Sequence, residues 1–251
     1  MYTQNELQQF ISFDIETVSS HKSLNELEVD NPRLGQLWRK RCVYLRNKHA
    51  DNLNLSDEEI FSQKAGLQAE FGKIVCISIS YVRFDKETST PTIKTKSFAN
   101  DDETLILKPF LNFIRKVQVD MPNSILVGHN IKRFDVPYIF KRSLINGLEV
   151  PDMLKTNGKK PWEMKLTDTA ELWSGGSWQE SFTSLDIMTT VLGLPTPKSE
   201  MDGSEVTDAY WNKGKLNEIA QYCERDVASV LNFLLRISNL PHVNLVDVVT
   251  T

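Results

Sequence analysis

The sequence has few cysteines and none of the arrangements in which cysteines usually act. Cys42, Cys76 and Cys223 are odd in number, far apart and outside any C-x-x-C spacing. Neither a disulfide framework nor a zinc site is therefore indicated. We expect a reducing compartment, and the cytoplasm in particular.

Long apolar runs and a strong charge excess are also missing. No apolar run approaches the ~20 residues of a membrane helix, and the N-terminal MYTQNELQQF lacks the basic and apolar regions of a secretion signal. The 29 Lys and Arg against 33 Asp and Glu give a net charge of −4. We therefore expect no membrane partner and no binder that holds duplex DNA by bulk charge, although an enzyme could still grip a few nucleotides locally.

The composition is that of a soluble globular protein. The 251 residues are 40% hydrophobic and 25% charged, which suggests neither disorder nor a fibrous class. This length allows one large domain or two small ones, and we favour a single domain over residues 1–251.

The order of apolar patterns predicts an α/β fold. Three apolar or alternating stretches indicate strands that form an antiparallel meander, and a fourth short strand follows a crossover helix. A polar, helical insertion separates the first two strands, an irregular stretch follows residue 150, and a long helix ends the chain. The expected strands are 10–20, 72–82, the segment after Pro91, and 124–130; the insertion is 20–70 and the last helix is 215–237.

Two acids interrupt the first apolar run, FISFDIETVSS. Asp14 and Glu16 are two residues apart, so on a strand they point to the same face. Buried carboxylates cost several kcal/mol unless something compensates their charge. Three other D-x-E pairs begin at Asp57, Asp85 and Asp101, but they fall outside strands and indicate solvated surface. The first pair therefore predicts a site that holds cations.

A second polar group lies in VGHNIKRFDVPYIFKR. Asn130 is expected at the end of a strand and Asp135 at the start of the next helix, which is where open α/β sheets bind ligands. Taken alone, Asp135 is also explained as a helix N-cap.

The third group is in the last helix, within YCERDVASVLNFL. Tyr222 and Asp226 are four residues apart and share a helix face. The alternative is an amphipathic helix in which Tyr222 packs on the core and Asp226 is solvated. Asp226 lies next to the buried stripe of Val227, Val230 and Leu231, which disfavours that alternative.

Together, FDIET, HNIKRFDVPYIFKR and YCERD resemble the three motifs of the DEDD superfamily of 3′-5′ exonucleases, tyrosine branch. The sequences of these motifs are most similar to those of the proofreading domain of family B DNA polymerases. The resemblance spans residues 10 to about 237, and a chain of 251 residues leaves no room for a polymerase. It therefore implies a free-standing exonuclease of this kind, with a ribonuclease H-like fold built on a mixed five-stranded sheet.

The resemblance also implies the site residues and the cofactors. Two divalent ions, Mg²⁺ or Mn²⁺, would be held by four carboxylates, with Asp14 shared between both ions. Tyr222 would orient the attacking water. The metal ligands implied are Asp14, Glu16, Asp135 and Asp226, and the catalytic set adds Tyr222.

Several further residues are candidates for binding substrate. Asn130, Phe134 and Thr17 are predicted to contact the terminal nucleotide or to support it, although core packing is the stronger explanation for Phe134. Four basic residues could form a rim for phosphates, but such a run is usually a solvated helix face; they are Lys132, Arg133, Lys141 and Arg142. His129 is interpreted as structural.

These observations predict a metal-dependent 3′-5′ exonuclease that releases nucleoside 5′-monophosphates from single-stranded or frayed DNA ends. One alternative is a catalytically weak nucleic-acid-binding or replication-associated module. Clustered acids that repel phosphate disfavour it. Another alternative keeps the chemistry and takes RNA as substrate, since the residues that read a 2′-hydroxyl cannot be placed. Replication or repair proteins are the protein partners that this function suggests.

Overall fold

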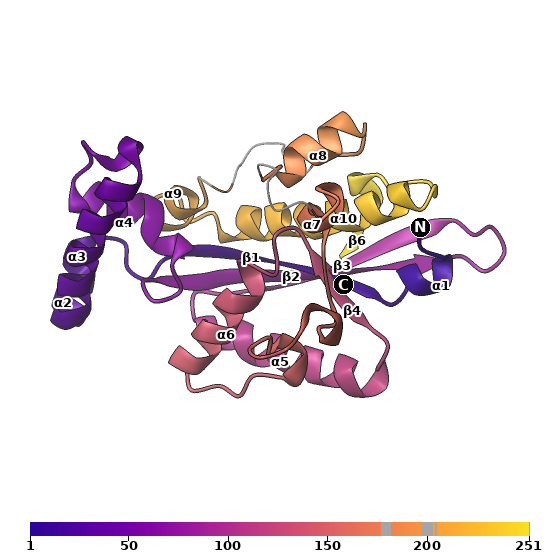
Figure 1. Ribbon diagram of the computed structural model, residues 1–251, viewed down its shortest axis with the longest axis horizontal. Helices are drawn as coiled ribbons and strands as arrows, with labels where there is room; N and C mark the ends of the chain where they lie inside the picture. Colours follow the sequence, from indigo (N-terminus) through magenta and orange to yellow (C-terminus); the bar gives the residue numbers. More distant parts are fainter. Residues whose placement is uncertain (177–181, 197–202, 204, 251) are drawn as a thin grey trace.

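A mixed β-sheet forms the centre of the protein (Figure 1). The computed structural model describes residues 1–176, 182–196, 203 and 205–250. The sheet order is β5-β4-β1-β2-β3-β6, in which β1, β2 and β3 are antiparallel while β4 and β5 continue parallel to β1. The strands are β1 (Phe10–Ser19), β2 (Gly72–Phe84), β3 (Pro91–Ala99), β4 (Ile125–Gly128), β5 (Leu166–Asp168) and β6 (Val249–Thr250).

The predicted mixed five-stranded sheet is confirmed, with one additional strand. The two residues of β6 pair with β3 and extend the sheet by a short sixth strand. The fifth strand, β5, lies within the stretch that was expected to be irregular. It has only three residues, which is too few for an alternating pattern to be recognised.

Helices cover both faces of the sheet (Figure 1). The long helix α10 lies across β1, β2 and β3 on one face, and α5 and α6 lie on the other. None of the described helices is both long and apolar enough to cross a bilayer. The helices are α1 (Gln4–Leu7), α2 (Leu24–Asp30), α3 (Pro32–Lys48), α4 (Asp57–Lys64), α5 (Glu103–Asp120), α6 (Asp135–Ile145), α7 (Thr169–Trp173), α8 (Leu185–Val191), α9 (Val206–Trp211) and α10 (Leu216–Ile237).

The two faces of β1 differ in chemistry because side chains alternate along a strand. Phe13 and Ile15 are buried in the apolar core with α5 and α6. Asp14 and Glu16 point to the opposite face, where their neighbours on β2 are Ser78 and Cys76. The face under α10 is therefore polar near its middle, and this is where the candidate site lies.

Residues 20–70 fold as α2, α3, α4 and two short 3-10 turns, η1 (Ala50–Asn52) and η2 (Ala65–Leu67), at one end of the sheet (Figure 1). They have a small apolar core of their own around Trp38, against which Phe61 and Phe71 pack edge-on. The turn η2 lies against the backbone of β1. A Cβ at Gly66 would come within 3.0 Å of the Val18 backbone, so the insertion is seated directly beside the strand that carries Asp14 and Glu16.

A buried ion pair holds α6 against α5. The Arg142 guanidinium donates to both carboxylate oxygens of Glu103, and one of these contacts is 2.6 Å long. The side chains are only 11% and 6% exposed. Glu103 also accepts from the Ile74 backbone N–H at 2.7 Å. This pair therefore sets the position of α6, whose first residue is Asp135.

Replacing Arg142 with methionine should lower the free energy of unfolding by about 3–5 kcal/mol, because Glu103 would remain as an unpaired buried charge. Lys141→Met is the matched control, since Lys141 and its partner Glu70 are about half exposed and such surface pairs contribute about 0–1 kcal/mol. Urea unfolding of the two variants measures the difference. Equal losses of stability would contradict the role given to Arg142.

Candidate active site

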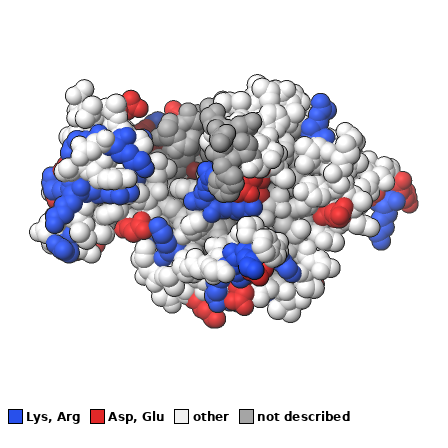
Figure 2. Space-filling model, viewed as in Figure 1, with Lys and Arg blue, Asp and Glu red and all other residues white. Residues whose placement is uncertain are grey.

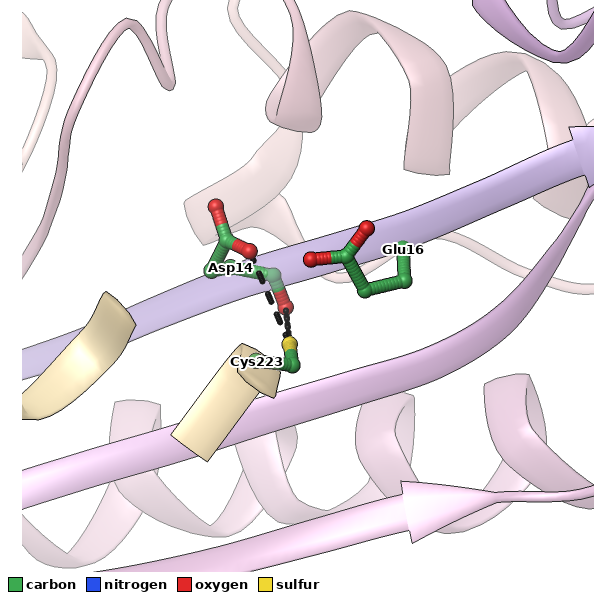
Figure 3. Close-up of side chains that lie close together, drawn as sticks. All are labelled: Asp14, Glu16 and Cys223. Carbon is green, nitrogen blue, oxygen red and sulfur yellow. Dashed lines mark hydrogen bonds between the residues drawn. The ribbon is translucent and has the colours of Figure 1, made fainter. Parts of the chain in front are cut away.

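Strand β1 brings Asp14 and Glu16 to the face under α10. The Glu16 side chain is 7% exposed, whereas Asp14 is partly accessible. A bulge interrupts the pairing with β2 directly after Glu16, and bulges often re-aim side chains beside active sites. Ligand atoms of Asp14, Glu16 and Cys223 lie within 4.8 Å of one another (Figure 3).

Asp135 reaches the same place from the opposite layer because β4 is short. Strand β4 pairs with β1 only up to Ser12, so the next part of that edge of β1 is not covered by β4. The Asp135 carboxylate fills this position and accepts from the Ile15 backbone N–H at 3.1 Å. Gly128 ends β4 where a Cβ would be 2.8 Å from the Phe13 carbonyl oxygen and closer still to Ile131. A residue without a side chain is required at this turn toward α6.

Helix α10 contributes Tyr222 and Asp226. They are one turn apart, and the Tyr222 hydroxyl forms a side-chain hydrogen bond with the Asp226 carboxylate. The Asp226 Oδ1 atom is buried and accepts no hydrogen bond from the residues that the structure describes. A buried carboxylate oxygen that accepts nothing is costly, which indicates that another group compensates it when the site is in use.

The pKa values of these carboxyl groups report their crowding. Burial raises the pKa of Asp14 well above its usual range, and repulsion by Asp135, Glu16 and Asp226 raises it further. Burial also raises the pKa of Glu16, with Asp226 the strongest repelling carboxylate. Mainly because of burial, the pKa of Asp135 and that of Asp226 are each raised to about 7. The structure thus brings together all four predicted carboxylates.

Tyr222 is held in its neutral form. Burial is the largest cause of its raised pKa, followed by the negative charge of Asp226, Glu16 and Asp14. A phenol that stays protonated can donate a hydrogen bond and position a neighbour, but it cannot accept a proton as a base at neutral pH.

The donor set fits hard divalent cations. Four carboxylates in mutual repulsion, one with an unsatisfied buried oxygen, are a donor set that suits hard divalent cations, which prefer oxygen ligands. Cys223 is the exception within the cluster. Its thiol donates to the Asp14 carbonyl oxygen at 3.5 Å and to Oδ2 at 3.6 Å (Figure 3), and burial raises its pKa. It therefore acts as a weak donor to Asp14 and not as a thiolate ligand.

Without metal, the protein should melt at a lower temperature at pH 8.5 than at pH 6.5. Each carboxyl has a higher pKa in the folded state than in the unfolded chain, so folding favours its protonated form. The resulting stability is complete below the unfolded pKa and is lost as the pH rises through about 7.

Melting curves in EDTA over this range measure the effect, with Asp135→Asn as the comparison. The variant lacks one of the raised groups, so its melting temperature should fall less as the pH rises. Equal slopes for both proteins would show that Asp135 does not titrate in this way.

The three predicted substrate contacts lie in β1 and in the turn before α6. Asn130 adopts a left-handed backbone conformation, with φ 67°, and lies in the turn before α6. Phe134 is half-buried against the Tyr138 ring at 5.4 Å and also lines a surface hollow. Thr17 follows Glu16, and its hydroxyl bonds to Tyr138. Asn130, Phe134 and Thr17 remain predictions as substrate-binding residues.

Most of the expected basic rim is already engaged in ion pairs. Lys132 pairs with Glu171 at 2.6 Å and Lys141 pairs with Glu70 at 2.8 Å. Arg142 is buried with Glu103, as described above. Arg133, in the turn before α6, lines the hollow beside Phe134. The charge run is thus mainly a means of anchoring α6 and the turn before it.

Asp168 is a positioning residue that the sequence patterns did not reveal. It is 3% exposed at the end of β5, and its carboxylate accepts from the backbone N–H groups of Asn130 at 2.8 Å and Lys132 at 3.2 Å. These bonds hold the turn that leads to Asp135. The sequence signal that could have indicated it is the stretch TDTA, in which Asp168 is also the N-cap of α7.

His129 is structural, as expected. Its two ring nitrogens contact the Thr169 hydroxyl at 3.0 Å and the Thr183 carbonyl at 2.8 Å. Burial lowers its pKa, so the ring is neutral and ties β4 to the segments around it.

A family profile described as "Predicted 3′-5′ exonuclease related to the exonuclease domain of PolB" matches residues 66–248. A protein named DNA polymerase from Pyrococcus glycovorans is 26% identical over 178 residues, which cover 62% of this chain and 21% of that protein. The match to the family profile starts after β1, so it includes Asp135, Tyr222 and Asp226 but neither Asp14 nor Glu16.

The fold is similar to that of a solved family B DNA polymerase from the hyperthermophilic archaeon Pyrobaculum calidifontis. The TM-score is 0.53 at 14% identity, over 91% of this chain and 24% of the polymerase. The chain therefore spans only a fifth to a quarter of the length of these relatives, and the similarity supports the ribonuclease H-like fold.

Proposed function

Because this chain belongs to the family of predicted 3′-5′ exonucleases related to the exonuclease domain of PolB, we propose that it is a metal-dependent 3′-5′ exonuclease of the DEDD superfamily, tyrosine branch. Its substrate would be a single-stranded or frayed DNA end, and its products nucleoside 5′-monophosphates.

The observation that carries this proposal is the convergence of carboxylates from three separate segments. Asp14 and Glu16 lie outside the residues that match the family, yet they face Asp135 and Asp226 from within it. A surface cluster of acids would be solvated, whereas this one is largely withdrawn from water. Such a cluster, with one unsatisfied buried oxygen, supports a divalent metal centre.

Asp14, Glu16, Asp135 and Asp226 would hold two divalent ions. When bound, such ions stabilise the negative charge that develops on the attacking and leaving oxygens of phosphodiester hydrolysis. The protein's own contribution is to fix the ligands on rigid elements. Asp135 is fixed by the Ile15 N–H and by the position of α6, and Asp14 by the strand and the Cys223 thiol.

Tyr222 would orient the attacking water. Its hydroxyl lies at the Asp226 carboxylate, and its raised pKa keeps the proton in place. The contribution of such a group is correct alignment of the nucleophile. The carboxylates around it, and not the phenol, would accept any proton released.

We propose DNA and not RNA as the substrate because the relatives are DNA polymerases by name. To test the proposal, 5′-labelled single-stranded DNA and RNA of the same sequence are incubated with the protein in Mg²⁺, Mn²⁺ or EDTA. The expected result is a ladder that shortens from the 3′ end of the DNA and requires metal. Circular single-stranded DNA should survive, since it offers no end.

Each alternative outcome has a distinct meaning. Faster shortening of the RNA would make the protein an exoribonuclease, and cutting of the circle would make it an endonuclease. Binding of either polymer without degradation in Mn²⁺ would favour the non-catalytic binding module.

Replacing Tyr222 with phenylalanine should lower the cleavage rate by about 10- to 10³-fold, because a positioning hydroxyl is lost while the carboxylates remain. Stabilisation by Mn²⁺ should be unchanged. Tyr210→Phe is the matched control, since it also removes a bonded hydroxyl, one that donates to Asp101 at 2.7 Å. Single-turnover rates and melting curves test this division. A Tyr222→Phe protein that no longer responds to Mn²⁺ would assign the hydroxyl a different role.

A further inference from the structure

Helix α3 of the insertion is strongly basic although the chain as a whole is acidic. Its 17 residues, PRLGQLWRKRCVYLRNK, include six Lys or Arg and no Asp or Glu. Two of the six are neutralised by neighbouring acids: Arg39 pairs with Glu28 and Asp57, and Arg46 pairs with Asp57. Figure 2 shows Lys and Arg side chains gathered at this end of the molecule. Because positive charges gather on α3 and only some of them are paired with acids, α3 is a candidate for binding a polyanion.

Three residues of α3 form a compact basic and aromatic group. Arg41, Tyr44 and Lys48 occupy one side of the helix, at spacings of three and four residues. The Arg41 guanidinium carbon is 4.7 Å from the centre of the Tyr44 ring, and the Lys48 Nζ atom is 5.8 Å from it. Tyr44 as a whole is 47% exposed. An exposed ring flanked by cations is the arrangement on which bases stack while phosphates are paired.

Two adjoining hollows lie between this group and the start of α6. One hollow of about 430 Å³ lies between η2 and the start of α6, lined by Arg41, Gln68 and Phe134 among others. A second hollow, of about 350 Å³, lies along α3 and is lined by Arg41, Tyr44 and Lys48. The two share Arg41, Leu67 and Gln68. Phe134, which lines the first hollow, is the residue before the predicted metal ligand Asp135.

We propose that this surface, made of Arg41, Tyr44 and Lys48 on α3 together with the hollow above Gln68, binds the single-stranded DNA that leads away from the 3′ end. The strand would leave the candidate site past Phe134, cross Gln68 and stack on Tyr44. This inference rests on the proposed function, which sets the direction of the DNA strand relative to the candidate active site. Binding of the strand does not itself require cleavage.

The charge around the two hollows favours a polyanion over an acidic or apolar protein segment. Among the described residues, two acids line the two hollows: Glu70 is engaged by Lys141 at 2.8 Å, and Asp51 lies in the hollow along α3. Arg41 donates to the neutral Gln68 side chain at 2.8 Å and so keeps its charge uncompensated by that contact. The residues of α3 precede residues 66–248, which match the family, so the α3 part of this surface lies outside the matched region.

The test measures binding of 5′-labelled dT20 by fluorescence anisotropy in EDTA, where no cleavage occurs. Arg41→Gln/Lys48→Gln removes two positive charges from α3. Lys108→Gln/Lys116→Gln, on the distant α5, removes the same number from exposed positions and is the matched control. Thermal melting verifies that each variant is folded.

The α3 double variant should bind dT20 at least tenfold more weakly than the control. Its slope of log affinity against log salt should be smaller by up to about 1.4, since each phosphate contact on a single strand contributes about 0.7. Tyr44→Ala should weaken binding by about 5- to 20-fold, and Tyr44→Phe should not, because stacking needs the ring and not the hydroxyl.

The outcomes separate this proposal from the proposed function. Equal affinities for the α3 variant and its control, or no binding of dT20 by the wild type, would overturn the DNA surface on α3. Weaker binding by the α3 variant together with no cleavage by any protein would retain the surface and reject the exonuclease. Normal cleavage of a short dT4 by the α3 variant would show that its candidate active site is intact, and so assign the loss with dT20 to the surface.

Discussion

Replacing Asp14 with alanine should abolish nuclease activity, with a loss of at least about 10³-fold in the cleavage rate. Asp14 is the carboxylate whose pKa is raised by all three of the others, so it lies at the centre of the cluster. Changing only the partners of metal ligands costs about 10- to 100-fold, and removal of a central ligand should cost more. Single-turnover cleavage of labelled single-stranded DNA in Mn²⁺ measures the loss.

A second D-x-E pair provides a matched control. Asp85 lies in the turn between β2 and β3, where its carboxylate accepts from the Glu87 and Thr88 backbone N–H groups at 3.0 and 2.8 Å. Asp85→Ala also removes the first carboxylate of a D-x-E pair, and it should leave the cleavage rate unchanged. If the Asp14→Ala protein kept more than about a tenth of the wild-type cleavage rate, the proposal of metal-dependent hydrolysis at this cluster would be wrong.

Mn²⁺ should stabilise the wild-type protein strongly, and Asp14→Asn should remove most of that effect. A ligand that binds only the folded state adds about 2.7 kcal/mol at a hundred times its Kd. In EDTA, Asp14→Asn should melt at the same or a higher temperature than the wild type, because one of several repelling carboxylates is neutralised.

The opposite sign is expected if Asp14 only has a structural role. In that case the substitution should destabilise the protein by roughly 1–5 kcal/mol whether or not metal is present. Melting curves of both proteins in EDTA and in Mn²⁺ separate the two cases. A large drop in EDTA together with an unchanged response to Mn²⁺ would refute the metal role of Asp14. Ser12→Ala, which changes a buried residue on the same face of β1, controls for general effects on the strand.

The strand that carries the first pair of acids could be predicted because it is long and local. FISFDIETVS is apolar at enough positions to indicate a strand, and an alternating backbone necessarily places Asp14 and Glu16 on one face. Helix α10 is likewise recognisable from its period, with Tyr222 and Asp226 one turn apart. Short elements are different. β5 has three residues, and its position depends on pairing with β4 rather than on its own pattern.

The residue types of the site and the local geometry of each pair can be read along the chain, because strand and helix periods act over a few neighbouring residues. That the pairs meet depends on contacts between elements that are far apart in the sequence. Asp135 reaches β1 because β4 ends early and leaves the Ile15 N–H to be bonded, and Asp168 holds the turn between them. Likewise, the charges of α3 are visible in the sequence, but which of them remain unneutralised depends on Glu28 and Asp57, brought close only by the packing of the insertion.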